Sequence, residues 1–276
     1  MVDCCNEVGH SSMMDYVGIR TARSVESNIA GMPRGGPDAS CLDRLLKTDR
    51  LEYLDRDSAG DTDNEARKRS VIRALDWTGE VFGNHERFAK IALDEVADVA
   101  DPQILELGAG HGGLSHKLLD WHPTAQLTVT DIESASVAAI AAGELGAHPR
   151  ATVREMDATA LDATDGQFDL AVFALSFHHL PPTAAAQVLA EGTRAARKLL
   201  IIDLPRPPAP LHVLQIATML PLALVVPFVH DGVISSLRAY SPSALRELAS
   251  HADPSIEVEL RGGLLSPQVV VATRAH

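Results

Sequence analysis

The stretch QILELGAGHGGLSHKLL, residues 103–119, decides how the rest of the chain is interpreted. Its first half contains a short apolar run, residues 104–107, that suits a buried strand. Its second half carries leucines at helical spacing, and glycines stand between the two at positions 108, 110, 112 and 113. Glycine lets the backbone approach a ligand closely, and the N-terminus of a helix offers free N–H groups. The stretch therefore predicts a cofactor-binding loop.

Strands and helices are expected to alternate after this loop. Apolar runs at residues 126–132, 151–156, 168–175 and 198–204 predict strands, and residues 134–145 and 183–196 predict helices, the first with Ser134 as its candidate N-cap. Residues 168–175, FDLAVFAL, are apolar on both faces, as in a central parallel strand. The chain ends differently, because residues 256–260 and 268–273 read as two strands separated only by a glycine break. The pattern predicts a doubly wound α/β fold with a mostly parallel sheet that ends in an antiparallel hairpin.

The chain before the loop divides into two parts. Residues 1–40 are polar and glycine-rich, with no sustained period, and are predicted to be a disordered extension. Residues 41–100 show apolar residues at helical spacing and are predicted to form a helical cap that ends before Asp101-Pro102. Residues 101–276 then form the main domain.

One segment breaks the alternation. Residues 211–229, LHVLQIATMLPLALVVPFV, carry no Asp, Glu, Lys or Arg and are long enough to suggest a membrane span. Pro221 and Pro227 interrupt the run, and a single crossing would place two parts of one sheet on opposite sides of a bilayer. We therefore predict an apolar lid, inserted at about residues 206–240, and no transmembrane span. Its surface is a candidate for contact with a membrane surface or with a second copy of the chain in a homodimer.

Composition narrows the classes of partner. The net charge of −13 argues against a sequence-independent grip on nucleic acid phosphates. The three cysteines, Cys4, Cys5 and Cys41, have neither disulfide nor zinc-site spacing, which favours a reducing, cytoplasmic compartment. No long apolar run marks a secretory signal near the N-terminus. No cluster of acids and histidines in the sequence predicts a bound metal.

The glycine loop fits the sequence patterns of two protein families, which bind different cofactors. Glycines 108, 110 and 113 satisfy the GxGxxG pattern of dinucleotide-binding domains, and Asp131 lies about where a ribose-binding acid belongs. An NAD(P)-dependent oxidoreductase is therefore one interpretation, and it predicts a sheet that continues in parallel βα units. The same residues also form a second pattern, Glu106-x-Gly108-x-Gly110-x-Gly112, in which an acidic residue is followed by alternating glycines.

Further motifs distinguish these interpretations. The third strand ends in MDA (residues 156–158), the fourth is followed by LSFHHL (residues 175–180), and the chain finishes with a hairpin. Together with the glycine pattern, these features resemble the class I S-adenosylmethionine-dependent methyltransferases of small molecules, over about residues 100–275. The resemblance implies a Rossmann-like, seven-stranded sheet. It also implies methyl transfer from S-adenosylmethionine to an apolar, aromatic small molecule such as a quinone, a polyketide or another natural product. A protein acceptor stays open.

The resemblance also assigns cofactor contacts, residue by residue. Glu106 and the backbone of the glycine loop would face the methionine portion, Asp131 would accept from both ribose hydroxyls, and Ile132 would pack on adenine. Asp157 and the N–H of Ala158 would bind the adenine edge, and Ala174 would line the methionine side. His111 is bulkier than the residue often found in such loops. The residues implied are Glu106, Gly108, Ala109, Gly110, Asp131, Ile132, Asp157, Ala158 and Ala174. Taken singly, Asp131 and Asp157 also suit plain turn acids.

Candidates for catalysis are three histidines. His178 and His179 follow the fourth strand and are placed to deprotonate an acceptor, although they equally suit a role in shaping the loop. His230 follows the apolar lid, and the neighbouring Asp231 is not expected to orient its ring. Arg238 and Tyr240 are candidates for substrate binding or for anchoring the next helix, which Ser241 would cap with Pro242 in its first turn.

Overall fold

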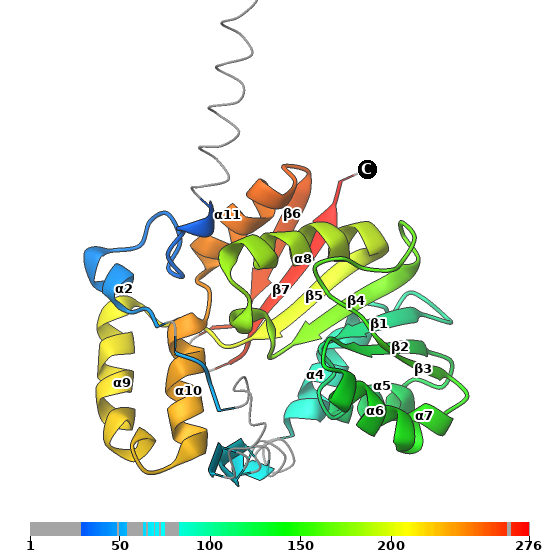
Figure 1. Cartoon of the computed structure of the whole chain (residues 1–276). Coiled ribbons are helices and arrows are strands. Elements are labelled where there is room, and N and C mark those ends of the chain that lie inside the picture. Colours follow the sequence, from blue (N-terminus) through cyan, green and yellow to red (C-terminus); the bar gives the residue numbers. More distant parts are fainter. Residues whose placement is uncertain are drawn as a thin grey trace, which may run out of the picture.

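The structure is a computed structural model that describes residues 29–48, 50–53, 63–64, 66–68, 70–71, 73–74, 83–263 and 266–275. Among them, seven strands form one sheet in the order β3-β2-β1-β4-β5-β7-β6 (Figure 1). The first five strands pair in parallel, and β7 is antiparallel to both β5 and β6. The predicted fold class is confirmed. The strands are β1 (Gln103–Leu107), β2 (Gln126–Asp131), β3 (Ala151–Glu155), β4 (Phe168–Ala174), β5 (Ala196–Asp203), β6 (Ile256–Arg261) and β7 (Gln268–Arg274).

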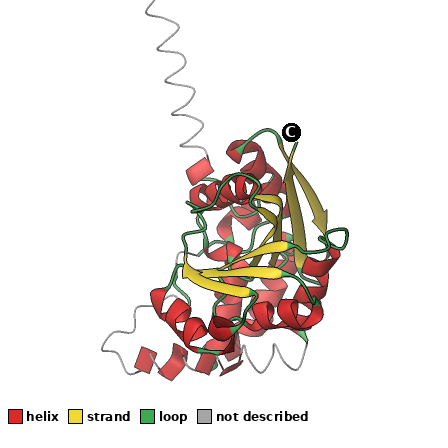
Figure 2. Ribbon diagram, turned by 90° about the vertical axis from the view of Figure 1, so that its right-hand side faces the viewer, coloured by secondary structure: helices red, strands yellow, loops and turns green. Residues whose placement is uncertain are grey.

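Helices cover both faces of the sheet (Figures 1 and 2). Leu105 and its neighbours on one face pack against α8 (Pro182–Ala195) and α11 (Pro242–Ala252). Ile104 and its neighbours on the other face pack against α4 (Asn84–Asp94), α5 (Gly113–Trp121), α6 (Ser134–Ala142) and α7 (Glu144–Ala147). Because successive residues of a strand point to opposite faces, a strand between two helical layers must be apolar throughout.

Two predicted helix starts had different outcomes. Ser241 caps α11 as predicted, because its side chain accepts from the backbone N–H of Ala244. Ser134 was predicted to cap one helix over residues 134–145, and this was wrong. Glu133 occupies the cap position and Ser134 is the first helical residue. The helix also stops at Gly143, and the short α7 follows.

The apolar segment forms two packed helices, α9 (Ala209–Ala223) and α10 (Pro227–Arg238), which stand side by side next to the sheet (Figure 1). The buried His212 of α9 bonds through Nε2 to Ser236 Oγ of α10 at 2.7 Å. Of the helices in the described residues, none has the length and apolar character that crossing a membrane requires. Pro221 lies inside α9, and large apolar side chains of α9 and the following turn are exposed, including Leu214, Leu222, Leu224 and Val225.

A segment before the sheet, residues 29–48 and 50–53, packs against this part of the molecule; we call it the N-terminal segment. It contains the short helix α2 (Cys41–Leu45). The buried Arg206 donates to Asp43 Oδ1 at 2.6 Å and to the carbonyl of Leu237 at 2.8 Å, so it joins this segment to α10. Ser241 N donates to the carbonyl of Arg34. Residues 29–40, which the sequence assigns to the extension, therefore pack on the described domain, whereas the prediction for residues 1–28 lies outside the described residues.

Candidate active site

The glycine loop connects β1 to α5 at the carboxyl edge of the sheet. Gly108, Gly110 and Gly112 have φ of +64°, +58° and +77°, which side chains rarely tolerate. A Cβ on Gly108 would lie 2.8 Å from Phe173 Cε2, so packing also requires glycine there. A Cβ on Gly110 would meet nothing within 4 Å. The loop therefore closes tightly on the sheet side at Gly108 and leaves open space at Gly110, as a surface that receives a ligand must.

Asp131 lies directly beside this loop, at the end of β2. Its Oδ2 accepts from the N–H of Gly110 at 2.9 Å, and its Oδ1 accepts from the N–H of Glu133 at 2.9 Å. Each carboxylate oxygen has two acceptor sites, so further donors can bind. The next residue, Ile132, is 66% exposed. The structure thus brings together a half-buried carboxylate, an open glycine surface and an exposed apolar side chain.

Glu106 is turned inward, toward α5. It is 3% exposed, and Ser115 Oγ donates to its Oε2. Burial raises the pKa of Glu106 to about 7; the Ser115 hydrogen bond works against this rise and the negative charge of Asp131 adds to it.

The remaining predicted cofactor residues lie on the neighbouring strands. Asp157 follows β3, and its Oδ1 accepts from Thr159 N at 2.8 Å and Thr159 Oγ1 at 2.7 Å, the bonding of a turn acid. Ala158 packs against the core beside it. Ala174 ends β4 and is followed by Leu175, which has φ of +55°. A positive φ at a residue other than glycine is uncommon and often marks a functional turn. No motif in the sequence predicts this conformation at Leu175.

His178 is held by a carboxylate that the sequence analysis missed. It lies in the short helix η1 (Phe177–His179), is 4% exposed, and pairs with Asp203 at the end of β5. Asp203 Oδ2 accepts from the backbone N–H of His178 at 2.8 Å, and Oδ1 lies 2.7 Å from Nδ1. Burial would raise the pKa of Asp203, but the charge and hydrogen bonds of His178 hold it below its usual value. The ionised carboxylate of Asp203 therefore accepts a hydrogen bond from Nδ1–H of His178, which turns Nε2 toward Glu52.

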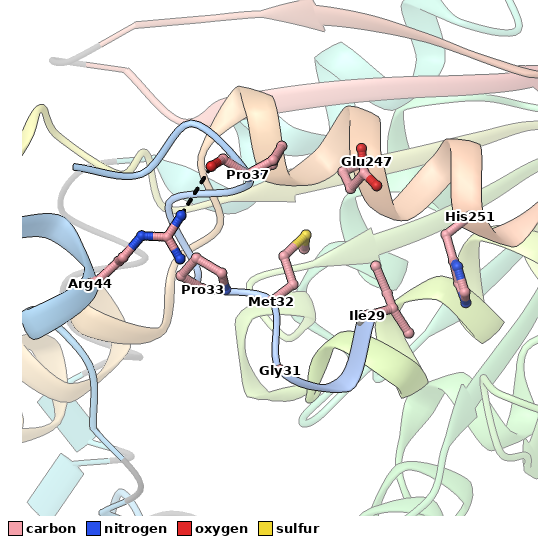
Figure 3. Close-up of a pocket in the computed structure, with 8 residues that line it drawn as sticks. All are labelled: Ile29, Gly31, Met32, Pro33, Pro37, Arg44, Glu247 and His251. Carbon is pink, nitrogen blue, oxygen red and sulfur yellow. Dashed lines mark hydrogen bonds between the residues drawn. The ribbon is translucent and has the colours of Figure 1, made fainter. Parts of the chain in front are cut away.

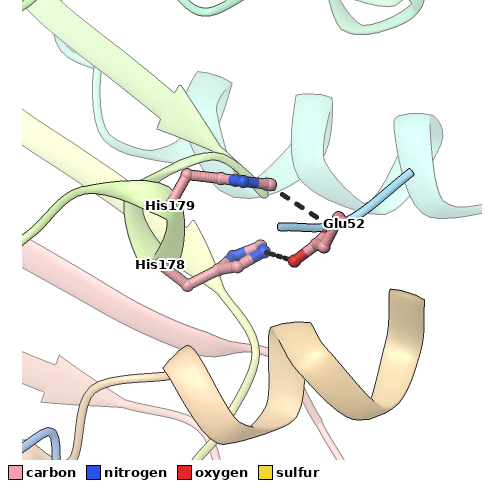
Figure 4. A group of neighbouring side chains, drawn as sticks. All are labelled: Glu52, His178 and His179. Atoms are coloured by element: carbon pink, nitrogen blue, oxygen red, sulfur yellow. Dashed lines mark ion pairs between the residues drawn. The ribbon is translucent and has the colours of Figure 1, made fainter. Parts of the chain in front are cut away.

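Glu52 is a second missed residue, and it comes from the N-terminal segment (Figure 4). Its side chain is 3% exposed; Oε1 lies 3.7 Å from His178 Nε2, and Oε2 lies 3.9 Å from His179 Nε2. Ser235 Oγ of α10 donates to Glu52 Oε1 at 2.8 Å. This acid–histidine cluster is not visible in the sequence, because Glu52 lies far from the two histidines along the chain and within an acidic stretch that shows no pattern.

His230 stands on α10 close to the N-terminal segment. Its Nδ1 lies 2.9 Å from Oδ1 of the adjacent Asp231, so the prediction that this aspartate would not orient the ring was wrong. Asp231 is fixed in turn, because both its oxygens lie 3.0 Å from the N–H of Tyr53. The Tyr53 ring packs on His230 at 4.7 Å between centroids. The backbone N–H and the ring of Tyr53 thus fix the positions of Asp231 and His230.

Arg238 and Tyr240 are engaged in structural contacts. Arg238 donates to the carbonyl of Arg50 at 2.9 Å. Tyr240 is 2% exposed, and its hydroxyl donates to the carbonyl of Leu180 at 2.8 Å. Burial raises the pKa of Tyr240. These hydrogen bonds hold the two side chains against the N-terminal segment and the end of η1, and neither is made to α11, the helix that the pair was predicted to anchor.

Two cavities in the described part of the chain lie elsewhere. One, of about 270 Å³, is lined by the N-terminal segment together with Glu247 and His251 of α11 (Figure 3). The other, of about 210 Å³, is lined mainly by α5, α6 and α7 and includes His111. Neither includes Asp131, Glu52 or the histidines of η1, so neither is the candidate site.

Comparison with known proteins identifies the family. The model of a methyltransferase domain matches residues 104–198, from β1 into β5. A demethylmenaquinone methyltransferase from Thermus thermophilus is 26% identical over 195 residues, which cover 65% of this chain and 86% of that protein. Residues 104–198 are a methyltransferase domain, and the matches support the class I S-adenosylmethionine-dependent type. The protein is accordingly an enzyme, and its cofactor is S-adenosylmethionine.

Structural comparison agrees with this methyltransferase assignment at the level of the fold. The plantazolicin methyltransferase BpumL, in complex with a desmethyl plantazolicin analogue and S-adenosylhomocysteine, superposes with a TM-score of 0.58 at 12% identity. The match covers 79% of this chain and 93% of that one. The nicotinamide alternative required further parallel βα units after β5, whereas the methyltransferase sheet ends in the antiparallel β7 and β6.

Proposed function

We propose that this methyltransferase transfers the methyl group of S-adenosylmethionine to an apolar, aromatic small molecule such as a quinone, a polyketide or another natural product. The observation that carries the proposal is the lid formed by α9 and α10, which carries no charged residue between positions 209 and 229 and stands next to the sheet. The relative from Thermus thermophilus, which is named for demethylmenaquinone, supports the same class of substrate.

The cofactor side of the site is proposed to be the glycine loop and the strand ends beside it. Open space at Gly110, the carboxylate of Asp131 and the exposed Ile132 fit a ligand with hydroxyl groups and a flat apolar ring. Bound S-adenosylmethionine supplies a methyl group on a sulfonium, which a nucleophile can attack. The residues proposed to hold it are Glu106, Gly108, Ala109, Gly110, Asp131, Ile132, Asp157, Ala158 and Ala174.

The acceptor side is proposed to be the three histidines, His178, His179 and His230. Ser176 connects this side to the glycine loop, because its Oγ would lie only 3.3 Å from a Cβ on Gly108. His178 and His179 follow within η1. Methyl transfer depends above all on holding a nucleophile in line with the methyl group. The main task of these side chains is therefore to position the acceptor and to stabilise its deprotonated form.

The exposed apolar residues of α9 support contact of the lid with a membrane surface that holds an apolar substrate. Sedimentation with vesicles of zwitterionic lipid tests this, and association into a homodimer without vesicle binding would assign the surface to a second copy. The cytoplasm is the proposed location, since the cysteine pattern suits a reducing compartment.

The cofactor side is tested by Asp131→Ala, with Glu133→Ala as a matched control. Both remove one negative charge at the same edge of the sheet, but only the Asp131 side chain bonds to the glycine loop. Isothermal titration with S-adenosylhomocysteine should show binding weakened by about 1.5–3 kcal/mol in Asp131→Ala, the scale of hydrogen bonds to a charged group, and little change in the control. Equal affinity in the two variants would contradict the ribose assignment.

The acceptor class is tested by screening apolar phenols and quinones for release of S-adenosylhomocysteine. Turnover that Asp131→Ala reduces would support the proposal. Methylation of a protein substrate, with no turnover on any member of the panel, would instead favour a protein acceptor.

A further inference from the structure

We propose that Glu52, His178 and His179 form a binding site for a divalent transition-metal ion, with Zn²⁺ as the first choice. The three side chains come from the N-terminal segment and from η1, and they converge on one point (Figure 4). One ligand atom from each lies within 4.8 Å of the others. The site is independent of the substrate proposed above, whereas its role in methyl transfer rests on the proposed function.

The spacing of these atoms suits a metal ion. Zinc binds histidine nitrogen and carboxylate oxygen at about 2.0–2.2 Å in a tetrahedral arrangement, which sets neighbouring ligand atoms about 3.3–3.5 Å apart. The observed separations, to different oxygens of Glu52, are 3.7 Å from His178 Nε2 to Oε1 and 3.9 Å from His179 Nε2 to Oε2. One ligand atom from each residue lies within 4.8 Å of the others, so the side chains would move closer together to bind one ion.

A buried imidazole nitrogen and a buried carboxylate face each other at the centre of the site. Asp203 holds Nδ1 of His178, so Nε2 is the ring nitrogen that points at Glu52. This nitrogen is buried and has no hydrogen-bond partner within the described part of the chain. A divalent cation between this nitrogen and the Glu52 carboxylate would bind both.

The surroundings are those that metal ligands usually have. A histidine that binds a metal generally donates its other N–H to a carboxylate, which fixes the ring and makes the free nitrogen more basic. Asp203 does this for His178. Ser235 Oγ orients Glu52 in the same way. Arg238 lies 3.9 Å from Glu52 Oε1 and offsets one of the two negative charges, so a divalent ion leaves the group with a net charge of about +1.

Such an ion would give His178 and His179 a definite role. Three protein ligands leave one coordination position open, as in catalytic zinc sites. An acceptor hydroxyl in this position would give up its proton to solvent more readily, because the ion would stabilise the oxyanion. The two histidines then act as ligands rather than as the base that removes the proton.

The test is metal binding by the full chain after treatment with a chelator. Titration calorimetry with ZnCl2 should show one strong site per chain, and Co²⁺ should develop the visible absorption of a four-coordinate site with nitrogen and oxygen ligands. Glu52→Gln and His179→Ala should each weaken Zn²⁺ binding about tenfold or more, since even supporting residues contribute tenfold to a hundredfold. The matched controls Glu257→Gln and His251→Ala change the same residue types elsewhere and should bind as the native protein does.

S-adenosylhomocysteine binding shows that each variant is folded, and it separates the two proposals. A native protein that binds the cofactor product but neither Zn²⁺ nor Co²⁺, or site variants that bind metal as tightly as the controls, would overturn the metal site. Methylation of phenols or quinones would then stand. Tight metal binding lost in Glu52→Gln supports the site even if no small molecule is methylated, a result that would overturn only the proposed substrate.

Discussion

Glu106→Gln is expected to remove a pH dependence from the stability of the protein. Burial raises the pKa of Glu106 from its usual 4.5 to about 7 in the folded chain. Between these values the folded state keeps a proton that the unfolded state has lost, so the free energy of unfolding falls as pH rises. The shift of about 2.5 pKa units corresponds to about 3 kcal/mol, at 1.36 kcal/mol for each unit. Glutamine has the shape of the protonated acid and cannot ionise.

Urea unfolding of the native protein and of Glu106→Gln, at pH 5 and at pH 8, measures this effect. From pH 5 to pH 8, the free energy of unfolding of the variant should rise by about 2–3 kcal/mol relative to that of the native protein. The reason is that most of the cost of ionising Glu106 in the folded chain develops in that interval. Taking the difference at each pH cancels the titration of other groups. Glu133→Gln, which changes an exposed carboxylate at the same edge of the sheet, should show no comparable gain.

The reasoning would be refuted by a difference between native protein and Glu106→Gln that is the same at both pH values. In that case Glu106 would be ionised in the folded chain despite being 3% exposed. Ser115→Ala provides a second check, since its hydroxyl donates to Glu106. Without that donor the carboxylate form loses support, so the fall in stability between pH 5 and pH 8 should become steeper.

Two further changes test packing around the lid and η1. Burial lowers the pKa of His212 from 6.5 to about 4, so the native protein should lose up to about 3 kcal/mol as pH falls from 6.5 toward 4; thermal unfolding over this range should show His212→Gln flattening that slope. Tyr240→Phe leaves the carbonyl of Leu180 without its 2.8 Å hydrogen bond and should lower stability by about 1 kcal/mol in urea at pH 7, whereas an unchanged midpoint would contradict the bond.

The fold could be predicted because its information is local. Each parallel strand is an apolar run between helical layers, and the final hairpin is indicated by two strand-like runs separated only by the glycine break at residues 262–263. Local signals also explain the errors. Ser134 has the side chain of a cap, but the extended backbone of Glu133 takes that position. Gly143 then leaves helical geometry with ψ of −166° and divides the predicted helix.

The two sides of the candidate site differ in how well they could be predicted from the sequence. The cofactor side follows from strand ends, because Asp131 and the glycine loop both lie at the carboxyl edge of adjacent parallel strands, where open α/β sheets bind ligands. The acceptor side depends on tertiary contacts. Glu52 contacts His178 only because the N-terminal segment crosses from α11 to α10. The spacing of residues along the chain does not predict this path.

The polar face of α10 explains why the acceptor side has this form. Asp231, Ser235 and Arg238 are buried on one side of the helix, and each bonds to residues 50–53 of the N-terminal segment. Buried polar groups of this kind are stable only when they are paired, so the helix and the segment fix each other. His230 and Glu52 belong to these same contacts. The acceptor side is therefore positioned by the pairing of α10 with the N-terminal segment, while the cofactor side is held by the sheet itself.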